Sequence, residues 1–278
     1  MGYRIVCDSC TDMNAAMLLD PHFVKVPLTI RVGDVAMVDD ETLSQSQLLW
    51  RMKACPTAPQ TSCPSPSQYL DVFAGEGDDI YVVTLSALLS GSHNVAAQAK
   101  AIYEEEGGTK NIAVFNSCSA SAGQSLIAMK IQALAESGMP FQQVVAEMNR
   151  FIAGMKTMFV LESLDNLRKN GRLTKVQAIV TETLKLKLLM GATPEGQICK
   201  LGQGMSMKQT LNKMIALAAK DEGHRGKMLV ISHCNCLDRA FYVRSEIETC
   251  CEFGEIVICE TGGISTVYAN DGGIVLAY

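Results

Sequence analysis

The feature that most constrains the fold is a continuous apolar run that leads directly into a serine-rich turn and then a helical pattern. Residues 78–87 read DDIYVVTLSA, residues 89–92 read LSGS, and HNVAAQAKAIYEEEG follows. A short, uninterrupted run of β-branched and aromatic residues is typical of a strand buried on both faces. A strand followed at once by a helix predicts a βαβ unit in a parallel sheet.

The same alternation recurs through the first half of the chain. Strands are predicted at 3–9, 79–87 and 109–117, and helices at 93–107, 121–138 and 140–155. Gly33 divides 25–39 into two predicted edge strands, and Ser44 is the predicted N-cap of a helix over 44–54. The proline-rich stretch 55–75 is expected to be loop until Ser67 caps a short helix.

From about Lys156 the pattern changes to a mixture of strands, helices and a hairpin. Strands are predicted at 156–163, 227–234, 255–261 and 272–278, a hairpin at 191–204, and helices at 164–171, 176–187, 206–223 and 238–251. The expected fold class is therefore α/β with two domains. An N-terminal parallel-sheet α/β domain spans 1–156, and a C-terminal mixed α+β domain spans 157–278.

Composition excludes several classes of protein. The chain has 278 residues, of which 48% are apolar and 19% charged, and its net charge is −5. This acidic balance argues against nucleic acid as a partner. No apolar run is long enough for a membrane helix and the first residues do not resemble a signal peptide, so we expect a cytoplasmic protein.

Metal binding and catalysis are both disfavoured. The eleven cysteines occur mainly in strand-like runs, without the paired spacing of a structural zinc site. No phosphate-binding Walker loop, dinucleotide-binding glycine pattern or nucleophile elbow is present. We therefore expect no metal, no catalytic residues and no cofactor, and the protein is predicted not to be an enzyme.

Three polar turns are expected to meet at one edge of the N-terminal sheet. Asp8 and Ser9 end the first strand, Ser90, Gly91 and Ser92 follow another, and Thr61 and Ser62 lie in the proline-rich loop. Ligands of parallel sheets bind beyond the carboxyl ends of the strands, where helix N-termini attract anions. For each segment taken alone the favoured explanation is structural, a helix cap at Ser90 or Ser92 and a simple turn at Thr61. The three together favour a small anionic ligand.

Arg172 lies in a tight turn between Gly171 and Thr174. The simpler interpretation is that it bonds backbone carbonyls at two helix ends, and we favour it. A role in holding an anionic ligand is the alternative, so Arg172 remains a candidate ligand-binding residue.

Several motifs together resemble the DegV family of bacterial fatty-acid-binding proteins, some of which serve as the acyl-carrier subunit of fatty acid kinase. The motifs are CDSCTD, QTSCPSP, SALLSGSHNVA, LESLDNLRKNGRL and the glycine-rich C-terminal stretch. The resemblance implies that one long-chain fatty acid is bound with its tail between the two domains. It also implies that Thr61 and Ser90 hold the carboxylate, that Gly91 permits close approach, and that Ser92 caps the helix.

Two positions depart from the pattern that many family members show. Tyr268 stands where a histidine is common, and Met205 stands at about the position of an arginine. Tyr268 can still donate a hydrogen bond, but the loss of both charged groups weakens the case for a kinase partner. We therefore predict a non-catalytic fatty-acid carrier that makes transient membrane contact for lipid exchange. A substrate-presenting subunit of a fatty acid kinase and a small-anion sensor without a long pocket are the alternatives.

Overall fold

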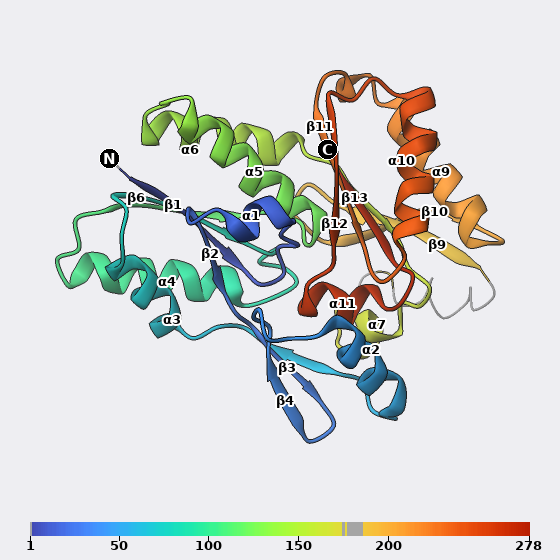
Figure 1. The fold of residues 1–278 in the computed structure, drawn as a ribbon, viewed down its shortest axis with the longest axis horizontal. Coiled ribbons are helices and arrows are strands. Elements are labelled where there is room, and N and C mark those ends of the chain that lie inside the picture. Colours follow the sequence, from blue (N-terminus) through green and yellow to red (C-terminus); the bar gives the residue numbers. More distant parts are fainter. Residues whose placement is uncertain (1, 174–175, 177–185) are drawn as a thin grey trace.

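The structure is a computed structural model that describes residues 2–173, 176 and 186–278 (Figure 1). The helix predicted over 176–187 lies almost entirely outside the described residues. None of the helices within the described ranges could span a lipid bilayer.

The N-terminal part is built on a four-stranded parallel sheet, as predicted. Its strand order is β2-β1-β6-β7, and every neighbouring pair is parallel. The strands are β1 (Tyr3–Asp8), β2 (Phe23–Val26), β6 (Asp79–Thr84) and β7 (Asn111–Asn116). Helices α3 (Pro66–Ala74) and α4 (Ser92–Glu105) cover one face, and α5 (Ala122–Glu136) and α6 (Phe141–Gly154) cover the other (Figure 1). The short α1 (Ala15–Leu19) follows β1.

A small antiparallel sheet, with order β4-β3-β5, projects from this part of the chain. It contains β3 (Thr29–Val32), β4 (Val35–Val38) and β5 (Gln60–Ser62), and α2 (Gln45–Ala54) connects β4 to β5. The hairpin at Gly33 is confirmed, with φ of 59° at the glycine. The strand β5 was predicted as loop, because a three-residue strand flanked by prolines has no pattern of its own and depends on pairing with β3.

Helix caps in this region were predicted with mixed success. Ser44 caps α2, since its hydroxyl accepts a hydrogen bond from the Gln47 amide at 3.4 Å. The prediction that Ser67 caps the next helix was wrong. Ser65 is the N-cap of α3, its own amide donates to Gln68 Oε1 at 2.8 Å, and Pro66 occupies the first helical position, where no amide hydrogen is needed.

The C-terminal part is a six-stranded mixed sheet with order β10-β9-β8-β13-β11-β12. Its strands are β8 (Thr157–Val160), β9 (Lys187–Ala192), β10 (Ile198–Gly204), β11 (Met228–His233), β12 (Glu255–Glu260) and β13 (Ile274–Ala277). Its helices are α7 (Asp165–Lys169), α9 (Met207–Lys220), α10 (Leu237–Cys250) and α11 (Gly263–Ala269), with a 3₁₀ turn at Glu222–His224. The two-domain α/β fold class is thus confirmed, while the boundary between 156 and 157 stays a prediction.

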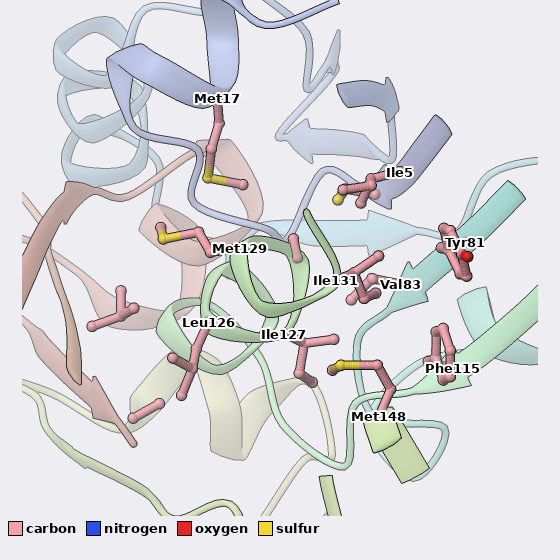
Figure 2. Close-up of a cluster of buried hydrophobic side chains, with 14 of the residues drawn as sticks. Ile5, Met17, Tyr81, Val83, Phe115, Leu126, Ile127, Met129, Ile131 and Met148 are labelled. Atoms are coloured by element: carbon pink, nitrogen blue, oxygen red, sulfur yellow. The ribbon is translucent and has the colours of Figure 1, made fainter. Parts of the chain in front are cut away.

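Helix α5 lies between the two sheets and joins their cores. Leu126 and Ile127 belong to one apolar cluster with Tyr81 of the N-terminal sheet (Figure 2). The same cluster includes Val230 and Val275 of the C-terminal sheet. A helix that is apolar on most of its surface must be covered on most sides. The helix therefore packs against both sheets and fixes them against each other.

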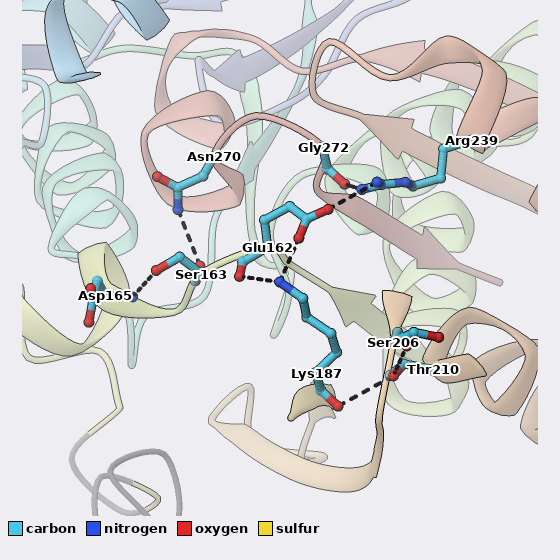
Figure 3. Close-up of polar contacts among 9 residues, drawn as sticks. All are labelled: Glu162, Ser163, Asp165, Lys187, Ser206, Thr210, Arg239, Asn270 and Gly272. Atoms are coloured by element: carbon cyan, nitrogen blue, oxygen red, sulfur yellow. Dashed lines mark hydrogen bonds and ion pairs between the residues drawn. The ribbon is translucent and has the colours of Figure 1, made fainter. Parts of the chain in front are cut away.

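The end of β8 is held by an ion-pair network that is separate from this core. Glu162 contacts the Lys187 ammonium at 2.5 Å and the Arg239 guanidinium at 2.9 Å, and Arg239 also donates to the Gly272 carbonyl (Figure 3). Burial alone would raise the pKa of Glu162, but the two cations outweigh it and lower the pKa. The network ties β8, β9 and α10 together.

We expect Glu162→Gln to lower the free energy of unfolding at pH 7 by less than about 1 kcal/mol, because solvent screens a side chain that is 36% exposed. A lowered carboxyl pKa stabilises the fold above the unfolded-state pKa, and this contribution is lost as the pH falls through the folded-state pKa. The difference between variant and wild type should therefore shrink below about pH 4. Urea denaturation across pH 3.5–7 checks this, and a difference that grows on acidification would contradict it.

Candidate functional site

A cavity lies where the two domains meet. It has about 770 Å³ of empty space, part of it open to solvent. Leu85, Leu89 and Ala120 line it from the N-terminal domain. Phe159 and Leu161 line it from the β8 region, with further residues from the β9–β10 hairpin and α11.

The serine and threonine hydroxyls in this lining are hydrogen-bonded to other groups of the protein. Ser119 Oγ and Thr157 Oγ1 lie 2.7 Å apart and link the two domains, and Ser265 Oγ donates to the Cys10 carbonyl at 3.2 Å. Ser121 donates to the Asp12 carboxylate. Because these groups are already paired, the wall that the cavity presents is almost wholly apolar. Such a wall suits an aliphatic chain.

One end of the cavity is polar. Tyr268, near the end of α11, places its hydroxyl 2.7 Å from Thr61 Oγ1 on β5. The Arg172 guanidinium lies over the Tyr268 ring, with its central carbon 5.8 Å from the ring centroid. Both Arg172 and Tyr268 line the cavity, and Thr61 reaches it through Tyr268. Since one of the two hydroxyls donates its hydrogen to the other, the pair has one hydrogen left, which together with the guanidinium can hold a carboxylate.

The local environment explains how these groups are held. Arg172 Nε donates to the Leu89 carbonyl at 3.2 Å, and its NH1 donates to the Asn170 carbonyl. The prediction that Arg172 bonds backbone carbonyls at two helix ends is therefore confirmed in part, because Asn170 is the C-cap of α7 whereas Leu89 lies in the turn before α4. Burial raises the pKa of Tyr268, so its hydroxyl stays protonated and able to donate.

The serine hydroxyls in the turn at residues 90–92 make contacts that differ from those predicted. Ser92 is the first residue of α4, and its buried hydroxyl donates to Asp8 Oδ2 at 2.7 Å, so the prediction that Ser92 caps the helix was wrong. The Ser90 hydroxyl instead accepts a hydrogen bond from the Ser92 amide at 3.2 Å. Gly91 has φ of −73°, and a β-carbon there would lie 3.5 Å from Cys63 Sγ, so no contact within the chain requires a glycine. Close approach of a ligand at Gly91 stays a prediction.

Asp8 and Ser9 are buried in the protein behind the cavity. The Asp8 carboxylate accepts hydrogen bonds from the Leu85 and Cys10 amides, the Ser92 hydroxyl and the Gln124 amide nitrogen. Burial raises the pKa of Asp8, and these hydrogen bonds oppose that rise. The Ser9 hydroxyl accepts from the Leu28 amide at 3.0 Å. Both residues brace the turns that form the site, and neither lines the cavity.

Ser62 is exposed on β5 and pairs with Thr29 across the small sheet. Successive side chains of a strand point to opposite faces, so Ser62 does not share the orientation of Thr61. The structure thus brings Thr61, Tyr268 and Arg172 together, with Ser90 in the adjacent turn.

The sequence did not predict the part of the cavity formed by β8, the β9–β10 hairpin and α11. Phe159 and Leu161 alternate along a strand, a pattern that also fits an ordinary core. Helix α11 was missed because GISTVYA is rich in β-branched and small residues, whose helix propensity is low. No cluster of three His, Cys, Asp or Glu side chains that could hold a metal occurs in the described ranges.

The fold and site define a class: two-domain α/β proteins with an apolar pocket between the domains and a polar group of hydroxyls and guanidinium at one end. The chain matches the family model described as "Uncharacterised protein, DegV family" over residues 3–278. It is 34% identical over 284 residues to a DegV domain-containing protein of Streptococcus gordonii, covering 100% of this chain and 99% of the relative. The chain belongs to the DegV family.

Solved structures of the family superimpose on the whole chain. A DegV family protein from Ruminococcus gnavus ATCC 29149, refined with vaccenic acid, has 44% identity and a TM-score of 0.96, covering 100% of this chain and 99% of that one. The fatty acid kinase (Fak) B3 protein of Streptococcus pneumoniae, loaded with linoleic acid, has 33% identity and a TM-score of 0.91, with the same coverage. A DegV family protein from Eubacterium eligens, loaded with heptadecanoic acid, has 30% identity and a TM-score of 0.90, covering 99% and 98%.

Proposed function

We propose that the protein binds one long-chain fatty acid, with the tail in the cavity between the domains and the carboxylate at its polar end. The observation that carries the proposal is the combination of an apolar interdomain wall with Thr61, Tyr268 and Arg172 at one end. The fatty acids bound by family members of 30–44% identity support it. The protein acts as a non-catalytic carrier and uses no cofactor.

Ser90 is the proposed fourth head-group residue. Its hydroxyl oxygen accepts the Ser92 amide hydrogen, and a hydroxyl can donate its own hydrogen at the same time. Arg172 contacts the carbonyl of Leu89, the residue before Ser90, so both head-group segments lie within reach of one ligand.

The tail supplies most of the binding free energy. Each buried methylene contributes about 0.8 kcal/mol, so a sixteen-carbon chain gains about 12 kcal/mol before the costs of ordering it. The head group adds a few hydrogen bonds, which orient the ligand and avoid an unpaired buried carboxylate.

Mass spectrometry of the purified protein tests the proposal. We expect the native protein to carry close to one fatty acid per chain, which denaturation and organic extraction release and identify. An empty protein that also takes up no added fatty acid would refute fatty-acid binding. Tight binding of short-chain carboxylates with no gain from chain length would instead support the small-anion sensor.

Presentation of the fatty acid to a kinase is a second candidate function, favoured by the likeness to the Fak B3 protein of S. pneumoniae. Two positions argue against it, because they lack the charged groups that many family members have. Tyr268 stands where a histidine is common, and Met205, which is 77% exposed, stands at about the position of an arginine. Acyl-phosphate formation in the presence of a fatty acid kinase and ATP separates presentation from simple carriage.

A further inference from the structure

Helix α11 is held at its N-terminus by a carboxylate from the small sheet. Asp39 follows the last residue of β4, and its Oδ1 and Oδ2 accept hydrogen bonds from the Gly263 and Ile264 amides, each at 2.8 Å. Asp39 is 2% exposed, and its own amide donates to the Leu28 carbonyl at 2.9 Å. Both carboxylate oxygens therefore hold a helix that lies more than two hundred residues further along the chain.

The other end of α11 is held by the same sheet. Thr61 bonds the Tyr268 hydroxyl from β5, and β5 and β4 both pair with β3. In the register, Ile30 lies opposite Thr61 and Thr29 lies opposite Val38, the neighbour of Asp39. One rigid sheet thus contacts both ends of a seven-residue helix. A displacement of the helix at Asp39 would also displace the tyrosine hydroxyl.

The contact at Asp39 leaves no free space. A β-carbon at Gly263 would lie 2.4 Å from Asp39 Oδ1 and 2.2 Å from Leu43 Cδ2, both far inside van der Waals contact. The helix can approach the carboxylate this closely only because residue 263 has no side chain. The contact with Asp39 therefore fixes both the position of α11 along its axis and its rotation about that axis.

We propose that Asp39 is a positioning residue for the head-group site: it fixes α11 so that the Tyr268 hydroxyl lies against Thr61. The inference rests on the proposed function, since it assumes that the carboxylate binds at this pair. A residue that only stabilised the helix would affect every ligand of the cavity equally. A positioning residue affects recognition of the carboxylate and leaves binding of the tail nearly unchanged.

The test compares two ligands that differ only in the head group, hexadecanoic acid and hexadecan-1-ol, on the full-length protein. Asp39→Asn keeps the size of the side chain but replaces one carboxylate oxygen with an amide nitrogen. This nitrogen cannot accept a hydrogen bond, so one of the two helix amides loses its acceptor. We expect the preference for the acid over the alcohol to fall by about fivefold, which corresponds to the loss of roughly one hydrogen bond. Affinity for the alcohol should change less than twofold. Asp40→Asn, at the neighbouring residue that bonds Thr42, is the matched control and should keep the wild-type preference.

Thr61→Ala in the same assay separates failure of the inference from failure of the proposed function. If Thr61→Ala abolishes the preference and Asp39→Asn retains it, Asp39 does not position the site. Equal loss of both ligands in Asp39→Asn also overturns the inference. A wild type that binds acid and alcohol equally overturns the head-group site itself, and the inference with it. Should Asp39→Asn fail to fold, Gly263→Ala displaces the same carboxylate and must lower the preference to a similar extent.

Discussion

A variant with Thr61→Ala and Tyr268→Phe is expected to bind hexadecanoic acid between about 10-fold and 100-fold more weakly than the wild type. The two hydroxyls lie 2.7 Å apart at the polar end of the cavity. Because the two hydroxyls bond each other, the pair can donate one hydrogen bond to the carboxylate, and a hydrogen bond to a charged group contributes about 1.5–3 kcal/mol. Arg172 keeps its part of the interaction in the variant. Isothermal titration calorimetry, or displacement of a fluorescent fatty acid, measures the change.

The double substitution is designed to leave the fold intact. Removing both partners of a hydrogen bond leaves neither one buried and unpaired, which costs much less than removing one. Ser62→Ala, at the adjacent exposed residue of β5, is the control and should bind like the wild type. Unchanged affinity in the double variant would place the carboxylate elsewhere in the cavity.

Asp8→Ala is expected to lower the free energy of unfolding by about 3–5 kcal/mol, the largest effect on stability that we predict. The carboxylate is fully buried and accepts hydrogen bonds from the turn after β1, from the β6–α4 turn and from α5. Its removal leaves several buried donors without an acceptor, and each unpaired donor carries a desolvation cost.

Urea denaturation measures this change as a lower midpoint at constant slope. Asp71→Ala, at an exposed position on α3, is the control and should change stability by less than about 0.5 kcal/mol. A midpoint for Asp8→Ala within the error of wild type would mean that the network around Asp8 is not a stabilising element.

The elements predicted best from sequence are those with a strong local pattern. The continuous apolar runs at β1, β6 and β7 predict buried strands without knowledge of their neighbours. The apolar residues of 121–138 recur with the period of a helix. The strand β5 and the helix α11 were missed because partners far along the chain hold them in place. Pairing with β3 makes β5 a strand, and the Asp39 carboxylate helps to hold the start of α11. Such contacts leave no periodicity in the local sequence.

The candidate site was predicted in part for the same reason. Sequence reasoning and the family resemblance named Thr61, Tyr268 and Arg172, which the structure brings together. Asp8 and Ser92 were also named, but they bond each other inside the wall. A hydroxyl or carboxylate at the end of a strand can face either the ligand or the core. Which one it faces depends on partners that only the tertiary structure reveals.

The order of strands in the C-terminal sheet has a consequence for how the protein acquires its ligand. Strand β13 lies between β8 and β11 in the sheet, and Val160 pairs with Ile274. The long segment of chain between these two residues forms a loop that must close before they can pair. Pairing over such a separation is slow, because the entropy of loop closure is lost before any contact compensates for it. Val275, which lines the cavity, lies on β13 and reaches its place only when that strand joins the sheet. We therefore expect the cavity wall to be complete, and able to enclose a fatty acid, only late in folding.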